Sequence, residues 1–300
     1  MKKKTYLFAL MAMVLTLGSC SDNENGIGGE TSKYITVSTS IGNMTRVATD
    51  AKGGQTFEEG DEISVYAWTG DATIAPDASE RVVNNAINKL TNGSWISTPQ
   101  MLWKNNREKH YFIGVYPTAA ISDLSAGEYT FDANKQTESD LLVAVNPDGL
   151  SYNVDEQQPV PLTFTHVMAK LAVNLTYKNQ WGGIPTVEKV VVGNAAKEAT
   201  INYLTKVVTP STTAKEDFSL PEITENTKYV SVIIPQEDVK QLTIVIGGKN
   251  FVYDNGTPFK LESGKITTVN LEVGRDEIKL GDVKITNWED GSTFSGEALN

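Results

Sequence analysis

The stretch KYITVSTSI, residues 33–41, alternates apolar or β-branched side chains with polar ones. One face of an extended chain would carry Ile35, Val37, Thr39 and Ile41. The residues between them are a threonine and two serines. Because successive side chains of a strand point to opposite sides of its sheet, this period of two predicts a half-buried β-strand.

Similar short runs recur along the chain between turn residues, and we find no long amphipathic helix. The other expected strands span residues 62–68, 110–116, 141–145, 160–164, 169–177, 187–192, 229–234, 242–246 and 265–273. Many short strands predict an all-β chain of antiparallel sandwiches. A length of 300 residues suffices for two such domains, which we place at 33–160 and 161–300.

Two turns are predicted in the second half. Asn255-Gly256 tolerates the positive φ angles of a type I′ turn, so a hairpin is expected between residues 251–253 and 259–261. The other stretch, Gly247-Gly248-Lys249, lacks the spacing and the helix that phosphate binding needs, and is better interpreted as a turn.

The first twenty residues, MKKKTYLFALMAMVLTLGSC, have the form of a secretory signal. Three lysines precede an apolar run that is too short to span a bilayer. The end of this segment, LGSC, resembles a bacterial lipobox, in which Cys20 is lipidated; the alternative is an ordinary signal peptide with a chance cysteine. Residues 21–32 are polar and glycine-rich, which is typical of a flexible tether.

Composition excludes several classes of protein. A formal net charge of −11, without a basic stripe, argues against nucleic acid as a partner. The single cysteine rules out a disulfide within the chain. Two histidines, His110 and His166, make a zinc site or a Ser-His-Asp hydrolase improbable, and both are interpreted as structural.

No sequence motif points to catalysis or to a metal. The chain contains no HExxH, CxxC, P-loop or GxSxG pattern. Residues 58–62, EEGDE, are acidic, but they lack the alternating ligands of a calcium loop and favour a solvated turn. The five tryptophans allow a sugar-stacking platform, with core packing as the alternative, which we favour for Trp68 and Trp103.

Several stretches, taken in order, resemble the motifs of the fimbrillin (Mfa-like) family. FEEGDEISVY at 57–66 resembles F-x-x-G-D-x-I-x-V-Y, and FIGVYP at 112–117 resembles an aromatic strand that ends in Y-P. DLLVA at 140–144 and LTFTHVMAKL at 162–171 are similar to D-L-L-x-A and L-x-F-x-H-x-x-A-K-L. LESGK at 261–265 and ITNW at 285–288 resemble the C-terminal glycine turn and the final I-x-x-W.

This resemblance implies a structural subunit of a type V pilus (fimbrium) that serves cell adhesion, without enzymatic activity, cofactor or metal. The implied fold is two tandem transthyretin-like antiparallel β-sandwich domains. The implied route is a palmitate-bearing lipoprotein precursor, anchored to the cell outer membrane through Cys20, that later joins a cell-surface fimbrium. The implied partners are other fimbrillin subunits, an arginine-specific protease and a host or bacterial surface ligand.

The resemblance also implies that cleavage removes the first strand, here the one that carries Ile35, Val37, Thr39 and Ile41. Arg46 follows this strand in a small-residue setting, so the expected cut lies between Arg46 and Val47. A solvated loop arginine is the alternative. The other arginines lie too far along the chain to release that strand alone.

A C-terminal strand of another subunit would then fill the vacated groove. The candidate donor residues are Ile278, Leu280, Val283, Ile285 and Trp288. Gly281-Asp282 shifts the phase of the alternation, as a bulge or turn would. The alternative is that this strand only completes its own domain. A surface glycan-binding lipoprotein is the second functional hypothesis, which an exposed row of aromatic rings would favour.

Overall fold

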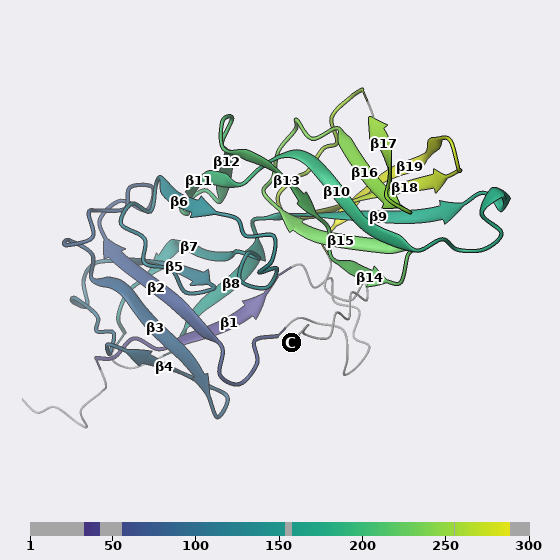
Figure 1. Ribbon diagram of the computed structural model, residues 1–300. Helices are drawn as coiled ribbons and strands as arrows, with labels where there is room; N and C mark the ends of the chain where they lie inside the picture. The colour runs from purple at the N-terminus through teal and green to yellow at the C-terminus, as the bar shows by residue number, and fades with distance from the viewer. Residues whose placement is uncertain (1–32, 43–55, 154–157, 255, 289–300) are drawn as a thin grey trace, which may run out of the picture. The chain divides into compact units, whose positions relative to one another are not determined.

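A computed structural model describes residues 33–42, 56–153, 158–254 and 256–288 (Figure 1). Within these ranges the only helical element is the short 3-10 turn η1 (Asn179–Trp181), so the chain is all-β. No helix in the described part is long and apolar enough to cross a membrane. Cys20, Arg46 and Val47 lie outside the described residues.

The strands follow one another with short connections. In the first half they are β1 (Val37–Ile41), β2 (Glu62–Thr69), β3 (Val83–Thr91), β4 (Ser94–Thr98), β5 (His110–Tyr116), β6 (Gly127–Thr130), β7 (Leu142–Leu150) and β8 (Val160–His166). In the second half they are β9 (Ala169–Tyr177), β10 (Val187–Ala196), β11 (Glu198–Asn202), β12 (Val207–Pro210), β13 (Lys215–Ser219), β14 (Glu222–Thr224), β15 (Lys228–Ile233), β16 (Gln241–Ile246), β17 (Lys249–Asp254), β18 (Lys265–Val273) and β19 (Ile278–Asn287).

Four sheets contain these strands. A seven-stranded sheet has the order β1, β8, β7, β5, β2, β3, β4. The second half has a four-stranded sheet (β13, β10, β16, β17) and a five-stranded sheet (β14, β15, β9, β18, β19). A three-stranded sheet (β12, β11, β6) joins the halves, because β6 comes from the first half. Two pairings, β1–β8 and β9–β18, are parallel, whereas the sequence predicted antiparallel sheets.

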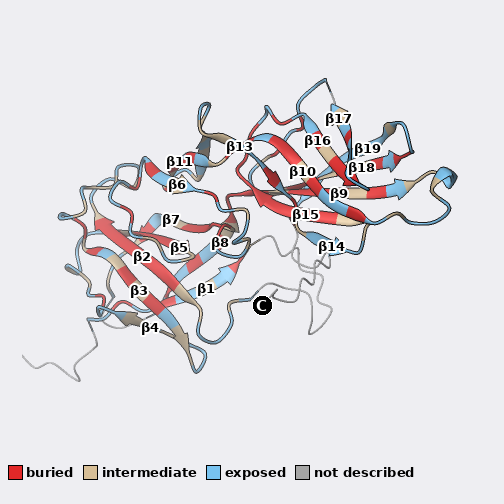
Figure 2. Ribbon diagram, viewed as in Figure 1, coloured by how far each residue is buried: buried red, intermediate tan, exposed pale blue. Residues whose placement is uncertain are grey.

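The seven-stranded sheet is buried on both faces at its centre (Figure 2). Residues 63–68 of β2 are all buried, which explains why its apolar run does not alternate. Val65 belongs to a smaller cluster that also contains Ile35, Val37 and Ile41, and we call this cluster the β1 core. Tyr66, the next residue, belongs to the larger cluster, which extends from this part of the first half through the second half.

The second half is a β-sandwich. Buried side chains of β10 and β16, such as Val190 and Ile244, lie in the same cluster as Leu171 of β9 and Val269 of β18. These residues come from the four-stranded and the five-stranded sheet. Their inward faces therefore form the core between the two sheets.

The period-two analysis located most of the strands. Strands β5, β9 and β18 have the expected bounds, and the expected strands at 62–68, 160–164, 187–192, 229–234 and 242–246 are confirmed to within a few residues. The expected turn at Gly247-Gly248 is also confirmed, because both glycines have positive φ and connect β16 to β17.

The hairpin predicted across Asn255-Gly256 is wrong. Strand β17 pairs with β16 through six residue pairs instead. After the turn, Phe259 donates its N–H to the carbonyl of Val239, and Leu261 forms a bridge with Gln236. The long pairing of β17 with β16 and the burial of Phe259 therefore outweigh the local turn preference of Asn255-Gly256.

Hydrogen bonding changes from one half to the other just after β8. The N–H of Val167 donates to Leu141 in the first half, and the carbonyl of Met168 accepts from Gly264 in the second. Strand β8 itself pairs with β7 and β1. The expected domain boundary between residues 160 and 161 stays a prediction. Because β8 pairs with strands of the first half, we propose that the boundary lies between residues 167 and 168.

Candidate functional site

Strand β1 lies at one edge of the seven-stranded sheet. It pairs in parallel with β8, from Val37 opposite Val160 to Ile41 opposite Phe164. The residues just before β1 are held by a different segment, because the N–H of Ile35 donates to the carbonyl of Met101 at 2.9 Å. The first strand is therefore bound along its whole described length.

The two faces of β1 differ as the sequence predicts. Ile35, Val37 and Ile41 have 1%, 5% and 8% of their surface exposed. Thr39, on the same face, is half-buried, and its Oγ1 accepts a hydrogen bond of 3.0 Å from Nε1 of Trp95 on β4. Because β1 and β4 are the two edges of the sheet, this bond shows that the sheet folds over the β1 core.

Strand β8 depends on β1. Its last residues pair with β7, from Phe164 opposite Ala144 to His166 opposite Leu142. In the described residues, Val160–Thr163 has strand pairing only with β1. We call the space that β1 fills beside β8 the β1 groove. Residues 160–163 form one wall of this groove, and they have a strand partner only while the groove is filled.

Small and aromatic residues shape the floor of the β1 groove. An added Cβ at Gly114 of β5 would lie 2.6 Å from Cζ of Phe164, so only glycine fits beneath that ring. The ring of Phe57 packs edge-on against Phe164, with centroids 5.1 Å apart. Sequence analysis placed Phe57, Gly114 and Phe164 in three separate motifs of the family resemblance. It predicted no contact between them, because they lie far apart in the chain.

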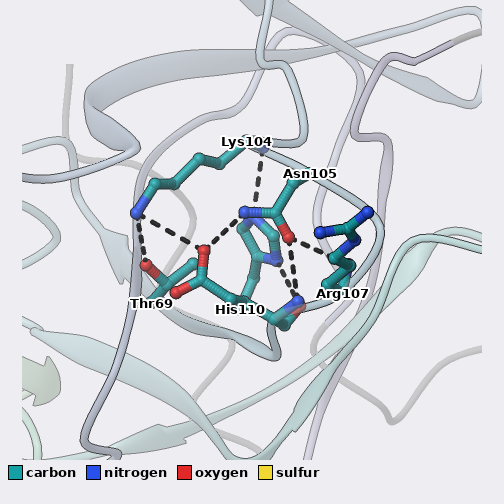
Figure 3. A network of polar contacts seen from close by, with 6 residues as sticks. Thr69, Lys104, Asn105, Arg107 and His110 are labelled. Atoms are coloured by element: carbon teal, nitrogen blue, oxygen red, sulfur yellow. Dashed lines mark hydrogen bonds and ion pairs between the residues drawn. The ribbon is translucent and has the colours of Figure 1, made fainter.

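A polar network fixes the segment that binds the start of β1 (Figure 3). The N–H of Lys104 donates to Nε2 of His110 at 3.1 Å, so Nε2 carries no proton. Its Nδ1 then donates to the carbonyl of Glu108 at 3.2 Å. Burial lowers the pKa of His110, and the nearby Glu108 only partly opposes this shift. His110 is thus a neutral structural histidine, as expected.

Trp103 connects this network to β1. Its ring meets the ring of His110 edge-on at 4.9 Å between centroids, and its backbone N–H donates to the carbonyl of Lys33 at 3.1 Å. Trp103 is half-buried against the β1 core, whereas Trp68 is buried, so core packing is confirmed for both. None of the five tryptophans is exposed, so they form no exposed row of aromatic rings.

The acidic stretch at 58–62 forms a turn. Glu59 accepts a hydrogen bond from the N–H of Asn92, and Glu62 pairs with Lys89 at 3.0 Å. Asp61 accepts from the N–H of Glu58. Among the residues that the structure describes, no group of three or more His, Cys, Asp or Glu is arranged to hold a metal ion.

The candidate donor residues lie on or just after β19, an edge strand of the five-stranded sheet. Strand β19 pairs antiparallel with β18, with Leu280 opposite Leu271 and Asp282 opposite Asn270. Gly281 is the extra residue between these pairs, which confirms the predicted bulge.

The bulge keeps the apolar side chains of β19 on one face of the strand. Ile278, Leu280, Val283 and Ile285 lie opposite residues 273, 271, 269 and 267, which alternate along β18 and are all buried. Leu280, Val283 and Ile285 nevertheless remain 38%, 39% and 38% exposed. The apolar face of β19 is therefore only partly covered by its own domain.

Trp288 closes the end of β19. Its ring is stacked on that of His166, with centroids 3.9 Å apart and planes 8° from parallel. Nζ of Lys170 lies 3.9 Å from the centre of the same ring, and Nδ1 of His166 lies 2.8 Å from Oδ1 of Asp140. We call these four residues the Trp288 clamp; they come from three separate sequence motifs, so no local signal predicts their contact.

The comparisons with known proteins agree with this architecture. The chain is 25% identical, over 316 residues that cover 97% of both chains, to a Bacteroides uniformis protein provisionally named fimbrium subunit Fim1C. Two solved structures, provisionally assigned as cell adhesion proteins, share the fold. One is from Bacteroides uniformis, with 19% identity, a TM-score of 0.62, and coverage of 86% of this chain and 100% of that chain. The other is from Bacteroides ovatus, with 18% identity, a TM-score of 0.62, and coverage of 85% and 98%.

The family comparison covers most of the sequence. A sequence model of the fimbrillin-like family matches residues 45–288, from just before Arg46 to Trp288. The matched region contains β2 to β19 and the Trp288 clamp. The chain therefore belongs to the fimbrillin-like family.

Proposed function

We propose that this chain is a structural subunit of a type V pilus and that it assembles by strand exchange at the β1 groove. Family membership supports a fimbrial subunit on the cell surface, assembled with other fimbrillin subunits, rather than an enzyme. Strand exchange, protease processing and the two transthyretin-like domains are the finer parts of the proposal.

One observation carries the exchange: β1 is an edge strand on which half of β8 depends. Burial of Ile35, Val37 and Ile41 stabilises the docked strand by roughly 5–9 kcal/mol, an upper estimate from about 1.5–3 kcal/mol for each buried aliphatic side chain. Removing β1 exposes that apolar groove, leaves residues 160–163 without a strand partner, and frees the N–H of Val160, which donates to Thr36. Such an edge favours the addition of another strand.

The proposed N-terminal processing is the route that the family resemblance implies, and features of the sequence support it. The signal segment and Cys20 support a lipid-anchored precursor at the cell outer membrane. The chain runs from Ile41 to Arg46 through only four residues, so a cut between Arg46 and Val47 separates β1 from β2. Neither Cys20 nor Arg46 lies in the described residues.

The donor would be β19 of another subunit. Its edge position, its partly exposed apolar face and its bulge at Gly281 support this role. The glycan-binding alternative loses its main support, because all five tryptophans are buried or half-buried.

The experiment treats purified full-length chain with an arginine-specific protease and follows a detergent-resistant ladder on gels. Arg81 is buried and donates to the carbonyls of Ile121 and Ser122, so it resists cleavage. Arg107 and Arg275 are exposed, and a cut at Arg275 would break the covalent link between β19 and the rest of the chain. We therefore use a protected background that carries Arg107→Lys and Arg275→Lys.

In this background, cleavage should give a new N-terminus at Val47 and then a ladder. Arg46→Ala should abolish both, and Arg46→Lys should do the same because the protease requires arginine. A ladder of equal yield from the Arg46→Ala chain would refute the processing step. Quantitative cleavage at Arg46 without a ladder would refute exchange between copies of this chain.

A further inference from the structure

Lys206 is a half-buried cation in the turn between β11 and β12. Its Nζ donates a hydrogen bond of 3.1 Å to Oγ1 of Thr165, a neutral partner on β8. Within the described ranges no carboxylate pairs with it. Burial lowers the pKa of Lys206, as expected for an ammonium group that no anion compensates.

This lysine lies beside the end of the β1 groove. The N–H of Gly42, the residue after β1, donates to the carbonyl of Phe164 at 2.7 Å. An added Cβ at Gly42 would lie 2.7 Å from Cγ2 of Thr163, so that side chain would have to shift, and 3.9 Å from Cγ2 of Thr165. The residue of any strand that occupies this position in the groove is therefore a neighbour of Thr165 and of the ammonium group that Thr165 binds.

The apolar positions of β19 match those of β1 in either direction. With the Gly281 bulge retained, Ile278, Leu280, Val283 and Ile285 share one face, as Ile35, Val37, Thr39 and Ile41 do. This spacing alone therefore does not set the direction in which a donor strand enters.

Charge distinguishes the two directions. If β19 enters antiparallel to β8, Ile278 takes the place of Ile41 and Glu277 lies opposite Thr165, next to Lys206. If it enters parallel, Ile285 takes that place and the neutral Thr286 lies opposite Thr165. In its own chain Glu277 forms an ion pair with Lys178, so it is a carboxylate that already pairs with an ammonium group on this edge.

We propose that β19 of a second copy enters the β1 groove antiparallel to β8, with Ile278 in the position of Ile41 and Glu277 paired with Lys206. This inference rests on the proposed strand exchange. Antiparallel pairing is also slightly more stable per residue than the parallel β1–β8 pairing that it replaces. Lys206 is then the residue that selects the direction of the incoming strand.

A cross-linking experiment measures the direction. Full-length chains in the protected background also carry Cys20→Ser, which removes the native cysteine. Chains with Thr165→Cys are mixed with chains with Glu277→Cys or, as the matched control, Thr286→Cys, and are then cleaved, assembled and oxidised. Opposed residues of paired strands have Cα atoms about 4.5–5.5 Å apart, within reach of a disulfide.

The outcomes separate the inference from the function on which it rests. Disulfide dimers with Glu277→Cys and not with Thr286→Cys support antiparallel entry. Dimers only with Thr286→Cys, or with neither variant in chains that still assemble, overturn the antiparallel register while strand exchange stands. Failure of the parent chains to assemble overturns strand exchange and the inference together.

A charge exchange tests Lys206 itself. Lys206→Glu should slow ladder formation by about fivefold, the upper range for a partly exposed ion pair. Glu277→Lys in the same chain should restore the rate, since each chain is both acceptor and donor, and Lys240→Glu serves as an exposed control. If the double variant forms the ladder no faster than the sum of the two single effects predicts, the pairing of Lys206 with Glu277 is overturned.

Discussion

Replacing Ile35 with alanine should loosen β1 without unfolding the rest of the chain. Ile35 is 1% exposed and lies in the β1 core, and its N–H bonds to Met101. Thr36, the next residue, is exposed and faces solvent. Thr36→Ala is therefore a matched control that changes the same segment, just before β1, without altering its buried face.

The magnitude follows from the carbons removed. Ile35→Ala deletes three carbons at about 0.8 kcal/mol each, or roughly 2.4 kcal/mol before any cavity cost. Measured substitutions of this type span about 2–5 kcal/mol. Because a tenfold change in an equilibrium corresponds to about 1.4 kcal/mol, the opening equilibrium of β1 should rise by roughly 60-fold.

Hydrogen exchange reports this opening at one amide. The N–H of Val160 donates to the carbonyl of Thr36 at 2.8 Å, so it is protected only while β1 is docked. If β1 opens locally, exchange of this amide should accelerate by roughly 60-fold in Ile35→Ala and less than threefold in Thr36→Ala. Similar acceleration in both variants, or in neither, would refute the view that this apolar face holds β1 in the groove.

Three further predictions concern the residues around the groove. Trp288→Ala should lower the free energy of unfolding by about 3–5 kcal/mol in urea denaturation, whereas Trp288→Phe, which keeps a ring on His166, should cost clearly less. Gly114→Val should cost about 1–3 kcal/mol by the same measurement, because its Cβ meets Phe164 at 2.6 Å; an unchanged midpoint would contradict the close packing. The buried, neutral His110 has a pKa below its unfolded value, so its contribution to stability is complete above about pH 6.5 and is lost as the pH falls toward the folded pKa. His110→Gln should therefore flatten the loss of melting temperature between neutral and acidic pH, and an unchanged slope would contradict this assignment.

Local patterns predicted the strands with strong alternation or continuous apolar runs. Strands β5, β9 and β18 are rich in β-branched and aromatic residues, and their bounds were predicted correctly. Strand β3 was missed, because its sequence VNNAINKLT contains several asparagines and resembles a loop. One of them, Asn88, is nevertheless 1% exposed and donates to the carbonyl of Ala86, so tertiary pairing outweighs a poor local preference.

The candidate site was predictable only in part. The period of two identified the buried face of β1, and the phase shift at Gly281 predicted the bulge in β19. Neither pattern shows which strand lies beside β1 or in which direction. The contact of Thr165 with Lys206 and the Trp288 clamp join residues far apart in sequence, and a single sequence carries no signal for such contacts.

The dependence of β8 on β1 has a kinetic consequence for the proposed assembly. Cutting the chain at Arg46 breaks one covalent bond but none of the contacts that hold β1. The severed segment then behaves as a tightly bound peptide ligand, and its departure would leave residues 160–163 without a partner. A donor strand that binds while this ligand is leaving avoids that empty state. The residence time of the severed peptide, rather than the speed of the protease, would then set how quickly subunits join.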